Sequence, residues 1–425
     1  MNFVRLTFLL GLLAATHASA QSTANAPASR LDAVAVKGSS RFQSAQIAPA
    51  TGLHPGDPIT RDDIQKGADA LAALGLFSNV QYRFTTTATS GVSVEYDVAD
   101  APTVPVLFDN FPWFTDDELT AAIKTSVRLF DGTVPDHGAV LDDVSSALSR
   151  HLVAHGISAN VSHELVTLPA SGRQVLRFRA EGTEVNVQTV EFSDALAGSD
   201  HGIQDRIADL VGKPFSRSAV ELFEFEQVRP VYLVHGFLRV EFGEPSVHVE
   251  GTSKVVVHAP IDPGPAFSWG GVTWSGNTAI PAGELDKLVE LSPGASADGM
   301  KIQSTWENAR RAYEHLGYLD AALDRVPHFD AAAKRVSYEV KVTEGPQYQM
   351  GSLVLTGLSL EGERRIRAAW KIPAGAVFDN MIYEEFVEGR IKQAFAGLPV
   401  HYEKIGRFLQ KDPASAKVDV MLDFQ

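Results

Sequence analysis

The chain alternates between two hydrophobic periods along its length. In one kind of stretch the apolar residues stand three or four apart, which places them on one helix face. The clearest example is Ile302, Trp306, Ala309, Tyr313 and Leu316. In the other kind apolar and polar residues alternate, as in 335–342, which is typical of a half-buried strand. The pattern therefore predicts helices and strands in regular succession.

The predicted elements recur in one order. Each repeat opens with a strand, at 31–38, 103–110, 185–192, 269–276 and 350–357. A short helix follows, readable at 116–123 and 283–291, and then a longer amphipathic helix. Aspartate pairs at 62–63 and 142–143 favour helix starts, where they complement the helix dipole. Two strands close each repeat, the last at 91–98, 174–181, 254–260, 335–342 and 417–424.

Glycines mark the period of the repeat. Each longer helix is predicted to end at a glycine, and successive members of this series are 80 or 81 residues apart: Gly75, Gly156, Gly236, Gly317 and Gly397. A second series precedes the longer helices by a turn: Gly56, Gly132, Gly212, Gly294 and Gly375. Because glycine adopts positive φ without strain, these positions predict helix stops and turns rather than a reactive site. We expect Gly317→Val to unfold its repeat.

This succession predicts an α+β fold of five tandem βααββ domains in an elongated array. Each domain has two layers, with two helices on one face of a small sheet. The predicted divisions are a signal peptide at 1–20, a linker at 21–29, and domains at 30–100, 101–182, 183–263, 264–345 and 346–425.

Composition narrows the function classes. The 425 residues include no cysteine, which excludes disulfides, thiolate metal sites and cysteine nucleophiles. The net charge of −15 argues against nucleic acid and against an anionic membrane surface as partners. After residue 20 no apolar run approaches the roughly 20 residues of a membrane helix.

The first 20 residues predict export. Arg5 supplies a positive charge, a short apolar run follows, and Ala18-Ser19-Ala20 fits a cleavage site of small residues. The expected location is the bacterial periplasm, including a peripheral place at the inner face of the outer membrane.

The repeat resembles the POTRA (polypeptide-transport-associated) domain. The resemblance rests on the repeat length, on the helix-ending glycine, and on the Gly-Pro entries at Gly264-Pro265 and Gly345-Pro346 before the first strand. It covers residues 30–425, and it is weaker at 101–182 and 183–263, where the acidic-Gly-Pro entry is incomplete. The resemblance implies a periplasmic, non-enzymatic role in outer-membrane protein assembly or polypeptide translocation. Family members with five such domains continue into a transmembrane barrel, whereas we expect this sequence to correspond to the periplasmic portion without the barrel.

The resemblance also implies where partners bind. In this family the strand after the second helix receives a partner strand, here predicted at 77–84, 159–165, 237–242, 318–324 and 399–405. The partners implied are nascent outer-membrane clients or an outer-membrane barrel protein. The candidate residues on these strands are Phe77, Val80, Tyr82, Phe237, Val240, Tyr318 and Leu319. Phe111, Trp113 and Phe114 form a further aromatic cluster, for which contact with a neighbouring repeat and contact with a partner are both open.

Three common phosphate-binding or catalytic motifs are absent from the sequence. It contains no phosphate-binding G-x-x-x-x-G-K-[ST], no G-x-S-x-G and no H-E-x-x-H. His151 and His155 stand at a metal-ligand spacing, with His163 further on, but a closed site needs about four ligands. We therefore predict no catalytic residue, no metal and no cofactor.

Three alternatives to client binding remain. The repeats could form a rigid periplasmic adaptor with one fixed partner. The chain could be a relic of a full-length assembly factor that has lost its barrel. An enzyme with its site at a repeat interface is the third, and no motif supports it.

Overall fold

The computed structural model describes residues 29–86, 91–169, 171–251, 253–396 and 403–425. The predicted signal peptide at 1–20, residues 21–28 of the predicted linker, and Gly397 lie outside the described residues. The described chain forms two compact bodies. One holds residues 29–108, 114–166 and 174–183, and the other holds 109–113, 167–173 and 184–425.

The first body contains two sheets with the same strand order. The first sheet runs β2-β1-β4-β3 and the second β6-β5-β8-β7. The elements of the first are β1 (Ser29–Lys37), α1 (Ser44–Ile47), the 3₁₀ turn η1 (Ala48–Thr51), β2 (Pro58–Ile59), α2 (Arg61–Ala73), β3 (Phe77–Thr86) and β4 (Gly91–Asp100). Those of the second are β5 (Val104–Phe108), α3 (Asp116–Ser126), β6 (Thr133–Val134), α4 (Ala139–Ala154), β7 (Asn160–Thr167) and β8 (Gln174–Glu181).

The second body contains three sheets, ordered β11-β12-β9, β14-β16-β15 and β17-β19-β18, and a short pair of β10 (Glu241–Phe242) with β13 (Ile261–Asp262). The first group comprises β9 (Asn186–Phe192), α5 (Ala195–Ser199), α6 (His201–Ile207), α7 (Arg217–Phe223), the π-turn η2 (Glu224–Val228), α8 (Arg229–Val234), β11 (Ser246–Glu250) and β12 (Lys254–Ala259). The second comprises β14 (Ser268–Ser275), α9 (Ala282–Asp286), α10 (Gly299–His315), β15 (Ala322–Asp330) and β16 (Arg335–Thr343). The third comprises β17 (Gln349–Thr356), α11 (Leu360–Ala369), α12 (Asn380–Glu385), the π-turn η3 (Phe386–Arg390), α13 (Ile391–Ala394), β18 (Ile405–Asp412) and β19 (Lys417–Phe424).

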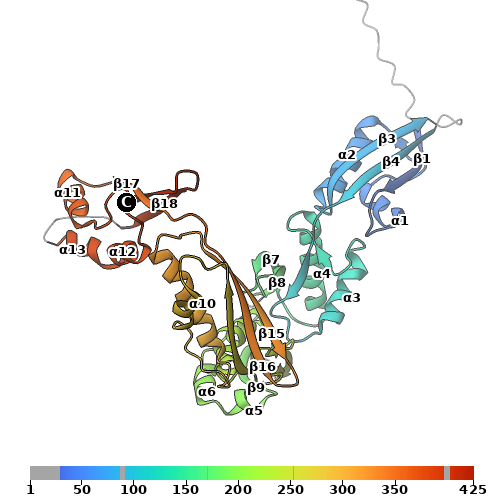
Figure 1. Ribbon diagram of the computed structural model, residues 1–425. Helices are drawn as coiled ribbons and strands as arrows, with labels where there is room; N and C mark the ends of the chain where they lie inside the picture. Colours follow the sequence, from blue (N-terminus) through green and yellow to red (C-terminus); the bar gives the residue numbers. More distant parts are fainter. Residues whose placement is uncertain (1–28, 87–90, 170, 252, 397–402) are drawn as a thin grey trace, which may run out of the picture. The chain divides into compact units, whose positions relative to one another are not determined.

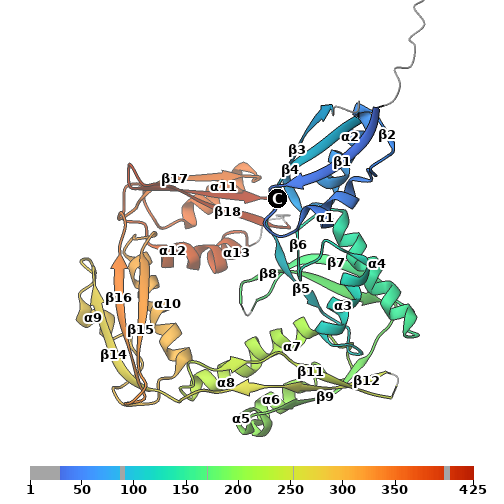
Figure 2. The same ribbon diagram turned by 90° about the vertical axis from the view of Figure 1, so that its right-hand side faces the viewer.

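The predicted α+β architecture of two-layer units is confirmed. Figure 1 and Figure 2 show helices against one face of a small sheet, as α10 lies along β15 and β16. In each unit the opening strand pairs parallel with the closing strand, and the strand between them in sequence pairs antiparallel with it, as β14 and β15 do with β16. The division into five domains at the predicted boundaries stays a prediction.

The hydrophobic stripes form the cores as predicted. Along α10, Ile302, Trp306, Ala309 and Tyr313 are buried against the sheet. Leu316, placed on the same stripe by its spacing, is 37% exposed because the helix has ended before it. Ser145, which interrupts the stripe of α4, is 8% exposed and lies 3.0 Å through its Oγ from Nδ1 of His163.

The helix-ending glycines adopt the predicted backbone. Gly75, Gly156, Gly236 and Gly317 have φ between 79° and 85°. At Gly317 the amide donates to the Glu314 carbonyl and the amide of Tyr318 donates to the Tyr313 carbonyl, at 3.1 and 3.0 Å. These two bonds are the Schellman pattern that satisfies the last carbonyls of a helix. The glycine is therefore a helix stop.

Candidate functional site

One edge of each sheet is open in the same way. The strand after the second helix always stands at the end of the strand order, so that among the described residues it pairs with one neighbour only: β3, β7, β11, β15 and β18. An open edge presents unpaired backbone N–H and C=O groups to any strand that arrives. The predictions at 77–84 and 159–165 agree with β3 and β7.

Three predicted edge strands are displaced. The prediction at 237–242 was wrong for most of its length, since β10 covers only Glu241–Phe242 and the edge strand is β11. The prediction at 318–324 began too early, because β15 starts at Ala322. The prediction at 399–405 meets β18 only at Ile405, and its residues 399–402 lie outside the described residues.

The residues after the glycines belong to helix caps. The rings of Tyr313 and Tyr318 lie 6.1 Å apart, and those of Tyr232 and Phe237 lie 5.9 Å apart. Such a contact accompanies a Schellman cap, so Tyr318 and Phe237 serve the helix end and not the edge.

The other two residues predicted beside these caps also pack inward. Val240 packs on the core of the group that contains β9 and β12, and Leu319 packs on the core of the group that contains β17 and β19. Neither residue belongs to an edge strand.

The predicted residues of the first edge divide into two kinds. Phe77 is 6% exposed and belongs to the core, which corrects its placement as a partner contact. Val80 and Tyr82 are half-buried on β3. The Tyr82 hydroxyl donates to Oε1 of Gln65 on α2 at 3.0 Å, so the edge strand and the helix are bridged there.

The aromatic cluster at 111–114 does not act as one group. Phe111 is 1% exposed, and half-buried Trp113 packs on the core built around Tyr232 and Val255. Phe114 packs on the rings of His151 and His155, with centroids 4.6 and 5.0 Å away. For Phe111 and Trp113 this favours packing within the chain over contact with a partner.

The histidines named as metal candidates face different neighbours. Nδ1 of His155 lies 2.9 Å from the carbonyl of His151, whereas His163 is turned to Ser145. Burial, and next the charge of His155, lowers the pKa of His151. Across the described residues, no group of three or more histidine, aspartate or glutamate side chains is arranged to hold a metal ion.

A groove of about 470 Å³ lies between α10 and the edge strand β15. Helix α10 contributes Gly299, Ile302, Gln303, Trp306 and Glu307, and the sheet contributes Arg325, Pro327, Phe329 and Tyr338. Helix α8 contributes its first residue, Arg229, and Leu233 near its end, and the loop after α8 contributes Leu238. A second hollow of about 250 Å³ shares Trp306, Glu307 and Arg325 and continues toward Arg310 and Leu323. The two hollows together follow the length of the edge strand.

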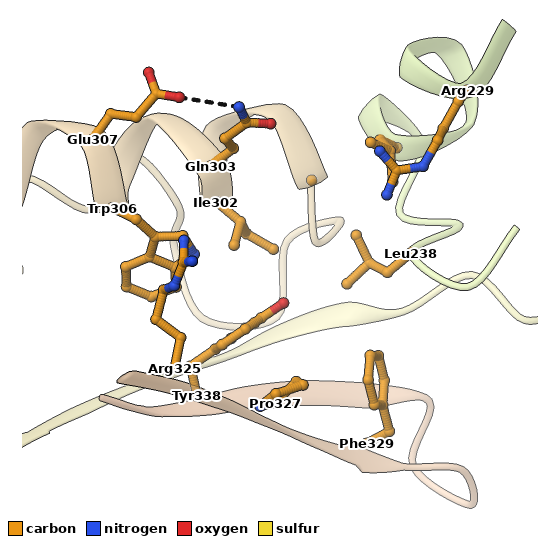
Figure 3. A pocket seen from close by; sticks show the side chains of 12 residues that line it. Arg229, Leu238, Ile302, Gln303, Trp306, Glu307, Arg325, Pro327, Phe329 and Tyr338 are labelled. Carbon is orange, nitrogen blue, oxygen red and sulfur yellow. Dashed lines mark hydrogen bonds between the residues drawn. The ribbon is translucent and has the colours of Figure 1, made fainter. Parts of the chain in front are cut away.

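The floor of the groove is aromatic. The ring of Trp306 lies 5.2 Å from that of Tyr338 and 5.9 Å from that of Trp274. Figure 3 shows the Tyr338 ring rising from the sheet, with its hydroxyl toward the space beneath Arg229. Burial raises the pKa of Tyr338, partly offset by the Arg325 guanidinium, so this hydroxyl keeps its proton and remains a hydrogen-bond donor.

The charged groups at the groove are mainly cationic. Arg229 and Arg325 reach the groove from opposite sides (Figure 3). Neither forms an ion pair with a carboxylate in the described part of the chain, and Arg229 instead lies 5.5 Å from the Phe225 ring. The one acidic side chain of the lining, Glu307, accepts a hydrogen bond of 3.0 Å from Gln303.

Proline sets the hydrogen-bonding pattern of the edge. Pro327 pairs with Tyr338 in a ladder that continues on both sides. Because proline has no N–H, the ladder tolerates it where its nitrogen faces away from β16. The backbone groups of Leu323, Arg325 and Phe329 then face outward, as does the carbonyl of Pro327. An added strand therefore finds three N–H donors and four C=O acceptors.

Sequence reasoning missed most of this groove. Trp306 was placed on the buried face of its helix, but Arg229, Arg325 and Tyr338 carried no local signal. Pro327 inside a strand-like run was the available clue, since such a proline marks an edge.

None of the helices in the described ranges combines the length and the apolar character required to cross a membrane.

Comparison with known proteins identifies two of the repeats. The POTRA family, described as a surface antigen variable number repeat, matches residues 29–100 and 267–345. A putative outer membrane protein assembly factor of Treponema pallidum (strain Nichols) is 23% identical over 253 residues, which covers 55% of this chain and 29% of that protein. The chain thus spans less than a third of the length of this relative.

Two solved structures were also found to be similar to parts or most of the chain. The Haemophilus influenzae BamA POTRA3-5 structure has a TM-score of 0.46 at 18% identity, covering 57% of this chain and 96% of that one. The N-terminal domain of Omp85 from Thermosynechococcus elongatus has a TM-score of 0.22 at 10% identity, covering 93% and 96%.

The family match, together with the strand order and open edge that the structure shows there, identifies residues 29–100 and 267–345 as POTRA domains.

Proposed function

We propose that this protein is a periplasmic binding protein for outer-membrane protein assembly that receives client chains by strand addition, with the β15 edge and its groove as the main site. The observation that carries the proposal is the combination of an open edge strand with an aromatic groove directly beside it. An added strand gains backbone hydrogen bonds that do not depend on sequence, and the groove takes alternate side chains. The edges β3, β7, β11 and β18 are further candidates.

Family and ancestry support this class of function. POTRA domains are non-enzymatic scaffolds, and the relative in Treponema pallidum is named a putative outer membrane protein assembly factor. The predicted signal peptide supports a periplasmic location. The partners we propose are unfolded outer-membrane clients or an outer-membrane protein that the chain docks.

Site-specific crosslinking tests the proposal. Because the chain has no cysteine, a single cysteine provides a unique attachment point for a photocrosslinker. We expect Val326→Cys, at an exposed position of the edge strand that does not line the groove, to crosslink an unfolded outer-membrane protein diluted from urea. Thr273→Cys is the matched control, since Thr273 is also exposed but lies on β14, at the opposite side of the same sheet.

Equal crosslinking from both positions would point to nonspecific contact, and no crosslinking from Val326→Cys would reject the β15 site. Val80→Cys on β3 and Leu409→Cys on β18 then report whether another edge receives the client.

A rigid adaptor with one fixed partner is the second candidate, favoured by contacts within the second body. The amide of Tyr348 donates to the Gly317 carbonyl at 2.8 Å, and its hydroxyl donates to Asp320 at 2.6 Å. These bonds tie the start of β17 to the turn after α10. Capture of one folded outer-membrane partner, without crosslinks to unfolded chains, would favour the adaptor.

A further inference from the structure

We propose that the groove between α10 and β15 selects extended segments in which a carboxylate side chain stands two residues from an aromatic one. This inference rests on the proposed function, since it names the kind of segment that the β15 site accepts. The segment is an internal stretch of a polypeptide, with the carboxylate held by Arg325 and Arg229 and the aromatic ring packed on Trp306 and Tyr338.

The charge argument begins with the chain as a whole. It has 52 acidic and 37 basic residues, so a carboxylate partner for an exposed arginine is seldom far away. Arg310, for example, forms an ion pair with Glu314, which lies on α10 with it. Arg325 and Arg229 nevertheless form no ion pair among the described residues, although both line the groove. Two guanidinium groups that line one groove, neither of them paired with a carboxylate, favour an anionic occupant.

The aromatic argument concerns the floor. Trp306 is 5% exposed and Tyr338 is half-buried, so their ring faces form a surface that is already shielded from bulk water. An aromatic ring of a client gains area burial and ring contacts there. The Tyr338 hydroxyl, which forms no hydrogen bond within the described residues, adds a donor at the same place.

The spacing follows from strand geometry. Side chains two apart on an extended segment point to the same face. On β15 itself, Arg325, Pro327 and Phe329 follow this rule and line the groove together. A segment added beside β15 therefore directs every second side chain over the same hollow, where one meets the arginines and the next meets the rings.

Ten-residue peptides with acetylated and amidated ends provide the probe. In the first, phenylalanine and glutamate stand two apart among threonines. In the second and third, glutamine and lysine replace glutamate. Calorimetric titration into the intact protein is expected to give the affinity order glutamate, glutamine, lysine, with about tenfold between the first two. The difference between these two should shrink with added salt.

Variants of the chain locate the preference. Arg325→Gln and Arg229→Gln should each reduce the advantage of the glutamate peptide, and Arg325→Glu should reverse the order in favour of the lysine peptide. Arg128→Gln, at an exposed arginine of the first body, is the matched control and should leave the order unchanged. Thermal melts check that each variant is folded.

The outcomes separate this inference from the proposed function. If the three peptides bind equally while Val326→Cys still crosslinks an unfolded client, strand addition stands and the charge selection is wrong. If no peptide binds and no crosslink forms, both are wrong. If vesicles with anionic lipid displace the glutamate peptide and bind less tightly to Arg325→Gln, the arginines serve a lipid surface and the peptide inference is overturned.

Discussion

The first and fourth repeats place different side chains at the same two positions of one backbone frame. Gln65 and Glu307 each stand ten residues before the glycine that ends their helix. In both repeats the opening strand has a bulge, at which its register against the closing strand shifts. Counted from this bulge, Tyr82 and Arg325 occupy equivalent positions on their edge strands. In the first repeat Tyr82 donates to Gln65 and spans the space between strand and helix, whereas in the fourth Arg325 and Glu307 border a groove.

The difference teaches where specificity resides in such a repeat. The backbone frame, including the bulge and the glycine stop, is common to both repeats. A pair of exposed side chains then decides whether the edge strand is bridged to its helix or stands beside an accessible hollow. Repeats of one fold are therefore free to differ in what they bind without a change of topology.

The largest expected effect is at the floor of the open groove. Trp306 is 5% exposed and packs on Trp274 and Tyr338, so Trp306→Ala should lower the free energy of unfolding by about 3–5 kcal/mol. Ile64 stands at the matching place in the first repeat, eleven residues before its glycine, so Ile64→Ala is the matched variant. Urea unfolding measures the loss of stability in both variants. A loss below about 1 kcal/mol for Trp306→Ala would show that the floor is not tightly packed.

The next effect is a pH dependence in the helix that supplies Arg229. Glu224 is 2% exposed in the π-turn just before α8, and its Oε1 has no hydrogen-bond partner among the described residues. Burial, and next the charge of Glu221, raises the pKa of Glu224 from 4.5 to about 8. The folded state then holds a proton that the unfolded state releases, so the contribution of Glu224 to stability is greatest below about pH 4.5 and declines as pH rises to about 8.

Glu224→Gln removes this titration. At pH 8 we expect the variant to be more stable than the native chain by about 2 kcal/mol, with the difference shrinking toward pH 5. Other groups near this helix titrate or carry charge, namely Glu221, Asp109, Arg173, Arg217 and Glu244, so the variant and the native chain are compared across the same pH series by urea unfolding. A pH-independent difference would contradict the role given to this proton.

A smaller effect tests the frame that the two repeats share. A methyl group on Gly317 would stand 2.9 Å from the Tyr348 carbonyl oxygen and 2.8 Å from Cγ1 of Val377, whereas nothing lies within 4 Å of one on Gly156. Both residues have φ near 80°, so Gly156→Ala reports the conformational strain alone, about 1 kcal/mol. Gly317→Ala should cost roughly 1 kcal/mol more. Equal losses in urea unfolding would mean that the close contacts relax freely.

How far the sequence predicted this structure depends on the kind of feature. The glycine spacing and the two hydrophobic periods predicted the order of elements, because backbone conformation and burial are local properties of the pattern. Phe237 and Tyr318 were misplaced, since a Schellman cap inserts a turn between glycine and strand and gives the aromatic to the helix. The groove escaped prediction because Arg229, Trp306 and Tyr338 come from three elements that only the tertiary fold brings together.

The smallest change in stability should come from closing the groove. Arg325→Tyr with Glu307→Gln copies the bridge of the first repeat onto exposed positions, so we expect a change within about 0.5 kcal/mol. Crosslinking of an unfolded client from a cysteine at Phe329 should nevertheless fall sharply. Retained crosslinking, with the bridge verified in a crystal structure, would separate client binding from the groove.

Hydrogen exchange on the intact chain tests the central claim most directly, because it reads the first and fourth repeats in one molecule. With a saturating unfolded outer-membrane protein, we predict that amides of β15 at Leu323, Arg325 and Phe329 exchange more slowly, while those of β3 around Tyr82 are unchanged. Protection of β3 with no change along β15, or no protection of either edge, would contradict the account.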